Sequence, residues 1–184
     1  LAIPRGCEDA VINILEDHDV KYNIEDKTYH GRKINVSFKG ELREEQQKAM
    51  EYMLSYNIGT LSATTAFGKT VFAIAMIAQR KVNTLILVHR KSLLDQWKKQ
   101  LEEFLEINEE IDNNTIKSKR KKDKSPIGVL CSGKNTIHGI IDIALIQSCL
   151  EENEIKAFVR DYGMVIVDEC HHVSSVSFEQ VLRK

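Results

Sequence analysis

The sequence predicts an α/β protein in which helices cover both faces of a mostly parallel sheet. Short apolar runs typical of buried strands alternate with helical patterns over residues 41–184. The tripeptide Gly-Lys-Thr at 68–70 follows one of these runs, and Asp168-Glu169 ends another. Because ligands bind at the carboxyl ends of the strands in such sheets, we expect both motifs at one edge of the sheet.

The composition is typical of a soluble globular protein, because 42% of the 184 residues are hydrophobic and 29% are charged. This length suits one domain with a small appendage. The net charge of −1 excludes a general attraction to polyanions, so a nucleic-acid contact must come from a local patch. The apolar run at 71–78 is far shorter than the ~20 residues of a membrane-spanning helix. Since the N-terminus also lacks a signal-peptide pattern, we expect a cytoplasmic protein without a membrane partner.

The cysteines and the chain ends add two further expectations. The four cysteines are scattered and could pair in two bridges, but free thiols in a reducing cytosol are the expected state. They are Cys7, Cys131, Cys149 and Cys170.

The sequence starts at Leu1 and stops at Lys184 inside a helical pattern, so we expect a piece of a longer protein.

Residues 1–40 are expected to form a small α+β appendage, and residues 41–184 the main domain. Residues 8–20 carry apolar side chains at helical spacing. Residues 21–38 alternate weakly and are interrupted by His30-Gly31, which indicates a hairpin. A bracing role suits this segment.

The main domain is expected to alternate between strands and helices. Helical patterns cover 41–56, 71–80, 91–107 and 149–162, and strands are expected over 58–63, 84–89, 127–131, 141–146 and 163–169. The basic run "KSKRKKDK" at 117–124 is either a solvated loop that offsets the acidic helix before it or a loop that contacts phosphates.

The stretch "SATTAFGKT" at 62–70 resembles a phosphate-binding loop with Ala63 in place of the usual first glycine. Gly68 would allow close approach of the backbone, Lys69 would reach the β- and γ-phosphates, and the hydroxyl of Thr70 would ligate Mg²⁺. Ala63 and Ala66 are small enough to replace glycine if the turn needs no positive φ there. Taken alone, the stretch could still be a plain turn at the start of a helix.

The stretch "VIVDECHH" at 165–172 places two carboxylates where an apolar strand ends. Asp168 would hold Mg²⁺ through water, and Glu169 would polarise the attacking water as general base. An isolated Asp-Glu pair could instead be a helix N-cap. Zinc is not expected at Cys170, His171 and His172, because adjacent residues cannot complete a tetrahedron.

Four blocks in this order, "SATTAFGKT", "LVHRKSLLDQW", "IDIALIQSC" and "VIVDECHH", closely resemble the first RecA-like motor domain of superfamily two helicases. The branch of DEAD/DEAH-box proteins related to type III restriction helicase subunits is the most similar. This resemblance covers residues 40–184 and implies a RecA-like P-loop NTPase fold that binds ATP and Mg²⁺. In "LREEQ", Arg43 and Gln46 match the adenine-recognition motif. The nucleotide would then contact Arg43, Gln46, Thr65, Ala66, Phe67, Gly68, Lys69 and Thr70.

The resemblance also implies a track for nucleic acid and a second motor domain. His89, Arg90, Gln147 and Ser148 match the positions that contact the backbone, whereas Trp97 on an amphipathic helix is interpreted as core. The Ser-Ala-Thr-like coupling motif and the arginine finger are absent from the sequence, so the chain alone is expected to hydrolyse ATP poorly. DNA is the preferred partner; an RNA helicase or a non-translocating P-loop switch remains an alternative.

Overall fold

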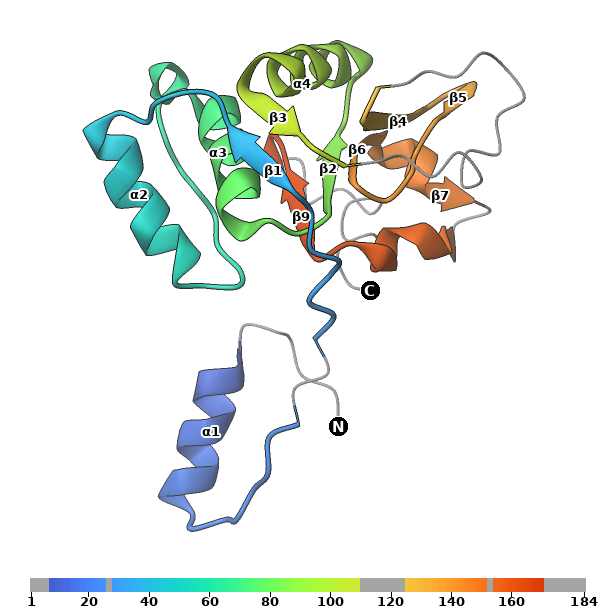
Figure 1. The fold of residues 1–184 in the computed structure, drawn as a ribbon. Helices are drawn as coiled ribbons and strands as arrows, with labels where there is room; N and C mark the ends of the chain where they lie inside the picture. The colour runs from blue at the N-terminus through green and yellow to red at the C-terminus, as the bar shows by residue number, and fades with distance from the viewer. Residues whose placement is uncertain (1–6, 26–27, 110–124, 152–153, 171–184) are drawn as a thin grey trace.

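The chain folds around a five-stranded sheet in a computed structural model that describes residues 7–25, 28–109, 125–151 and 154–170 (Figure 1). The strand order is β5–β4–β6–β2–β9; β5 is antiparallel to β4, and the other neighbours are parallel. The predicted mostly parallel α/β fold is therefore confirmed. The strands are β2 (Thr84–Val88), β4 (Ile127–Cys131), β5 (Lys134–Asn135), β6 (Ile141–Leu145) and β9 (Met164–Val167).

Strand β2, which lies between β6 and β9, is fully buried because each of its faces is covered. Ile86 and Val88 pack with the apolar side chains of two α-helices, α3 and α4. Leu85 and Leu87 face the other way, into a cluster with two 3-10 helices, η3 and η4. Alternate residues of one strand thus hold two layers together. The covering elements are α3 (Lys69–Arg80), α4 (Lys91–Phe104), η3 (Ile146–Cys149) and η4 (Ala157–Asp161).

A two-stranded ribbon of β1 (Val36–Phe38) and β3 (Leu105–Ile107) lies over α3 and α4. The hairpin expected around His30-Gly31 is wrong, because β1 pairs antiparallel with β3. Val36 is 1% exposed in the main core, so a distant strand offers it more burial than a local one. The last part of segment 1–40 thus packs with the main body, and the division at residue 40 stays a prediction.

Two further helices precede α3. The predicted helix α1 (Glu8–Asp17) is present but buries none of its residues, and Figure 1 shows it apart from the sheet. The predicted helix α2 (Glu44–Leu54) packs Met50 against Phe72 and Met76 of α3. No helix among the described residues is long and apolar enough to cross a membrane.

Two of the expected elements are wrong, and one helix ends early. Residues 58–63 form no strand. Most of their side chains are exposed, so pairing with a neighbouring strand would bury little apolar surface. The helix expected over 149–162 is replaced by a short hairpin and η4, which turns Val159 and Tyr162 onto the sheet. Helix α4 stops at Phe104 because the next residues pair with β1. The hairpin consists of β7 (Leu150–Glu151) and β8 (Glu154–Ile155).

Candidate nucleotide and nucleic-acid site

The Gly-Lys-Thr loop makes a tight turn into α3. A 3-10 helix, η2 (Thr65–Phe67), leads to Gly68, which caps α3 with φ of 77°. This left-handed conformation is the reason that glycine is needed at position 68. Among the described residues, neither Ala63 nor Ala66 has a positive φ. Alanine at these two positions is therefore compatible with the turn.

Lys69 bends back over the loop that precedes it. Its Nζ donates to the carbonyl oxygens of Ala63 (3.0 Å) and Thr64 (3.1 Å). The first N–H groups of an α-helix have no partner inside the helix, and the helix dipole makes this end positive. An ammonium group and free N–H groups at one helix start form an arrangement suited to an anion such as phosphate.

Helix α2 supports the loop from the side through Arg43 and Gln46. The guanidinium of Arg43 donates to the carbonyl oxygens of Ala66 (3.1 Å) and Phe67 (2.6 Å). The Nε2 of Gln46 also donates to Phe67 (2.7 Å), while its Oε1 accepts the N–H of Arg43 (2.8 Å). Gln46 is 4% exposed and both of its polar atoms have protein partners, so a contact with adenine would require it to release one of them.

The acidic pair lies directly after β9. The N–H of Asp168 donates to the carbonyl oxygen of Leu87 on β2 (3.1 Å), which extends the parallel ladder by one bond. The Oδ1 of Asp168 accepts the N–H of Glu169 (3.0 Å), and its Oδ2 accepts the indole N–H of Trp97 on α4 (2.8 Å). Glu169 is exposed and has φ of 57°, an uncommon conformation for a residue other than glycine.

The topology brings the two motifs to one edge of the sheet. Helix α3 leads into β2 by a short connection and therefore runs back against it, so its first turn lies where β2 ends. Strand β9 is parallel to β2, and Asp168 follows its carboxyl end. Lys69, Thr70, Asp168 and Glu169 thus share the carboxyl edge, where ligands bind in such sheets.

The donor atoms at this edge suit Mg²⁺. A carboxylate from Asp168 and a hydroxyl from Thr70 are the hard oxygen ligands that this ion prefers, and it commonly keeps several waters and takes phosphate oxygens. The described residues contain no group of three or more His, Cys, Asp or Glu that would hold a metal without such additional ligands. His171 and His172 lie outside the described residues.

The four residues expected to contact nucleic acid follow the ends of two adjacent strands. Val88 of β2 is in register with Leu145 of β6, so the segments that begin at His89 and Ile146 leave the sheet side by side. Arg90 and Gln147 are exposed, and His89 and Ser148 are half-buried. These assignments stay predictions, and the basic run 117–124 lies outside the described residues.

The sequence interpretation missed one contact of the acidic pair. Trp97 is 2% exposed and belongs to the core as expected, yet its N–H reaches Asp168. The sequence offered only a general indication of this contact, namely that the N–H of a buried tryptophan commonly has a hydrogen-bond partner. Which partner it finds depends on the packing of α4 against the sheet.

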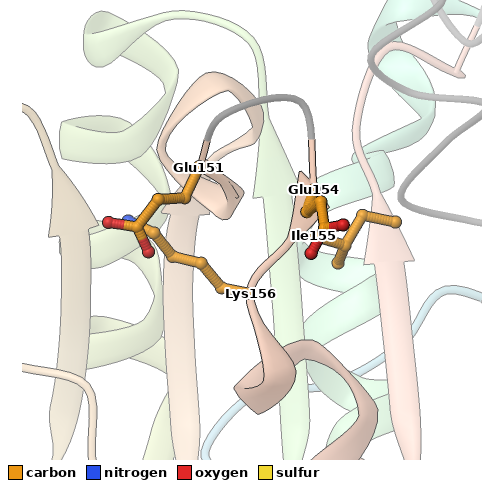
Figure 2. A pocket seen from close by; sticks show the side chains of 4 residues that line it. All are labelled: Glu151, Glu154, Ile155 and Lys156. Carbon is orange, nitrogen blue, oxygen red and sulfur yellow. The ribbon is translucent and has the colours of Figure 1, made fainter.

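Two other features of the described residues have no expected role in binding nucleotide or nucleic acid. A hollow is lined by Glu151, Glu154, Ile155 and Lys156, none of which was expected to contact nucleotide or nucleic acid; Figure 2 shows their side chains. The four cysteines are unpaired in the structure. Burial raises the pKa of the Cys149 thiol to about 12, so this group is a neutral core side chain.

The sheet order, with a Gly-Lys-Thr turn and an acidic strand end at one edge, is that of a RecA-like P-loop domain. The chain belongs to the family described as the type III restriction enzyme res subunit, which matches residues 39–184.

Three helicase-type relatives are similar to the chain. It is 32% identical over 144 residues to the putative helicase 161L of Invertebrate iridescent virus 6, covering 76% of the chain and 30% of that protein. It is 32% identical over 143 residues to the putative helicase 109L of Invertebrate iridescent virus 3, covering 73% of the chain and 39% of that protein. It is 26% identical over 143 residues to the DNA 3'-5' translocase XPB2 of Sulfurisphaera tokodaii, covering 78% and 28%. The chain thus spans well under half of the length of these relatives.

Proposed function

We propose that the chain is the first motor domain of an ATP-dependent helicase or translocase that acts on DNA. The observation that carries this proposal is the shared edge of the sheet, where Lys69 begins α3 and Asp168-Glu169 follows β9. Family membership supports the class of protein. Two similar proteins are named for DNA, the translocase of Sulfurisphaera tokodaii and the putative helicase Rad25 of Haloarcula marismortui, and one is named for RNA, the putative helicase L396 of Acanthamoeba polyphaga mimivirus; the choice of DNA follows the first two.

The loop residues would bind the phosphates of ATP. The backbone N–H groups at the start of α3 would face the β-phosphate, and Lys69 would exchange the carbonyl oxygens of Ala63 and Thr64 for phosphate oxygens. Arg43 and Gln46 would hold the loop from α2 and contribute to recognition of the base. The loop thus binds and orients the nucleotide.

The acidic pair would hold the metal and the water. Bound Mg²⁺ supplies positive charge that offsets the charge on the phosphates during transfer. Thr70 and Asp168 would hold this ion, Asp168 through water. Glu169 would orient the attacking water and take its proton.

A nucleic-acid strand would lie along the segments that follow β2 and β6. Arg90 supplies a cation, and His89, Gln147 and Ser148 supply polar groups suited to contacts with the phosphate backbone. Such contacts read little sequence, which fits a motor that moves along its substrate. We assign no role to the run 117–124.

A second motor domain would complete the catalytic site. None of the 184 residues matches the arginine finger or the coupling motif of this family. Such an arginine supplies ~10³–10⁵ in rate, so the chain alone should hydrolyse ATP close to background and gain nothing from DNA. Brisk, DNA-stimulated hydrolysis by the 184-residue chain would favour a self-sufficient ATPase.

Nucleotide binding is the first test. Calorimetry with Mg·ADP should show binding to the wild-type chain and none to Lys69→Ala, because the substitution removes the cation at the phosphates. Lys99→Ala, which removes an exposed lysine of α4, is the matched control and should bind normally. Equal affinity of the wild-type and Lys69→Ala chains would refute the nucleotide site.

The second test measures the binding of DNA and RNA strands. Fluorescence anisotropy with labelled DNA and RNA single strands of equal length should show weaker binding to Arg90→Ala. The slope of log affinity against log salt concentration should also be shallower by about one, because one contact with a phosphate is lost. Tighter binding of RNA than of DNA by the wild-type chain would overturn the choice of DNA. An unchanged salt dependence in Arg90→Ala would remove this residue from the track.

A further inference from the structure

Trp97 is held at the junction between the core and the acidic strand end. It lies on the second turn of α4, is 2% exposed, and packs with Leu94 and Leu101 in the main cluster. Its Nε1 nevertheless donates to the Oδ2 of Asp168 over 2.8 Å, although the two residues are 71 positions apart. One side chain therefore belongs to both the core and the candidate metal site.

This bond completes the restraint on the Asp168 carboxylate. One oxygen accepts the backbone N–H of Glu169 at 3.0 Å, and the other accepts the indole N–H. The backbone of Asp168 is itself bonded to Leu87 on β2 at 3.1 Å. With both oxygens engaged, the carboxylate plane has a fixed orientation relative to the end of β9.

We propose that Trp97 is a positioning residue for the metal at Asp168: its indole N–H orients the carboxylate that holds the Mg²⁺ of the bound nucleotide. This inference rests on the proposed nucleotide site. Each carboxylate oxygen keeps a further lone pair after accepting one hydrogen bond, so a metal-bound water can still donate to it. Loss of a hydrogen-bonding partner of a direct metal ligand costs ~10- to 100-fold in metal affinity, and because Asp168 would hold the ion through water we expect the lower end of this range.

The same geometry makes Trp97 an internal optical reporter. It is the single tryptophan of the 184-residue sequence, so all indole fluorescence arises at this bond. Binding of a cation at Asp168 changes the charge next to the indole N–H. The emission of Trp97 should therefore change when Mg²⁺ joins bound ADP.

The test compares ADP binding with Mg²⁺ and with EDTA in Trp97→Phe, which keeps an aromatic ring in the core and removes the N–H donor. Calorimetry should show about tenfold weaker Mg²⁺-dependent binding, with metal-free binding of ADP within about twofold of wild type. Phe104→Leu alters the core packing of the same helix about two turns from Trp97, against Phe38, and should leave both affinities unchanged.

The outcomes separate this inference from the proposed function. Loss of metal-free and metal-dependent binding in equal measure would make Trp97 merely structural and overturn the inference. An unchanged Mg²⁺ dependence in Trp97→Phe, with Lys69→Ala unable to bind, would overturn the inference and leave the nucleotide site intact. If the wild-type protein binds no nucleotide, the proposed function is wrong, and the inference about Trp97 is overturned with it.

The wild-type protein provides a measurement that does not depend on the folding of Trp97→Phe. Titration of Mg²⁺ into the ADP complex should change the emission of Trp97, and Asp168→Ala should abolish this response. Binding of Mg²⁺ that calorimetry detects but the emission of Trp97 does not follow would overturn the inference.

Discussion

The side-chain amide of Gln46 donates to the carbonyl oxygen of Phe67 over 2.7 Å, and so fixes the residue before Gly68. A Cβ at Gly68 would lie 3.2 Å from the same amide nitrogen. Helix α2 and the loop therefore pack closely at the start of α3. A residue that the family resemblance assigns to the base also holds the phosphate loop in this structure.

We expect Gln46→Ala to weaken both base selectivity and the binding of phosphate. The substitution removes the bond to Phe67 and the bond from the Arg43 N–H, each worth about 1 kcal/mol. Calorimetry should show about fivefold to tenfold weaker Mg·ADP binding, and competition should show a smaller preference for ATP over GTP. Gln47→Ala, on the neighbouring exposed position of α2, is the control. Wild-type affinity in Gln46→Ala would mean that the loop does not depend on this contact.

The backbone at Glu169 leads to a prediction about stability. Its φ of 57° disfavours any residue with a Cβ and suits glycine. Glu169→Gly should therefore be more stable to urea than Glu169→Ala, by about 1 kcal/mol. In a protein that includes the proposed second motor domain, both variants should lose ATP hydrolysis, because neither retains the proposed general base. Equal stability of the two variants would show that the conformation at 169 costs nothing.

Asn83 connects four segments at the amino edge of the sheet and is 3% exposed. Its Oδ1 accepts the N–H of Arg32 (2.9 Å) and of Gly163 (3.0 Å). Its Nδ2 donates to the carbonyl oxygens of Asp161 (2.7 Å) and Gly139 (3.3 Å). A single amide thus joins the segment before β1 to the starts of β6 and β9.

Replacement of Asn83 should destabilise the fold strongly. Asn83→Asp keeps the acceptor but turns a second oxygen toward two carbonyl groups, and should lower the free energy of unfolding by about 3 kcal/mol. Asn57→Ala, on an exposed asparagine, should change it by less than about 0.5 kcal/mol. Urea unfolding followed by circular dichroism measures both. A small effect of Asn83→Asp would mean that this network does not support the folded state.

The strands and loops that the sequence predicts correctly are those with a local signal. Strands β2 and β9 are apolar runs, and Gly68 has the positive φ that its place in the motif indicates. The bond of Gln46 to Phe67 joins residues 21 positions apart, and that of Trp97 to Asp168 joins residues 71 apart. Such contacts depend on how helices dock, which no local pattern encodes. Residues 58–63 show that a local signal is not sufficient. The sequence predicts a strand there, but no neighbouring strand pairs with this segment and it stays irregular.

The stability of the fold should fall as the pH drops below about 6.5, the pKa of histidine in unfolded chains, because of His138. Its side chain is 3% exposed, and burial lowers its pKa; the charge of Asp142 opposes this and that of Arg32 adds to it. A lowered pKa in the fold means that the unfolded chain binds the extra proton first, so acid favours unfolding. Urea unfolding from pH 7.5 to 5.5 should show a steeper loss of stability for wild type than for His138→Phe, which keeps a ring and cannot titrate. His18→Asn, at the exposed C-cap of α1, is the matched control. If His138→Phe has the same pH dependence as wild type, the buried imidazole is not its source.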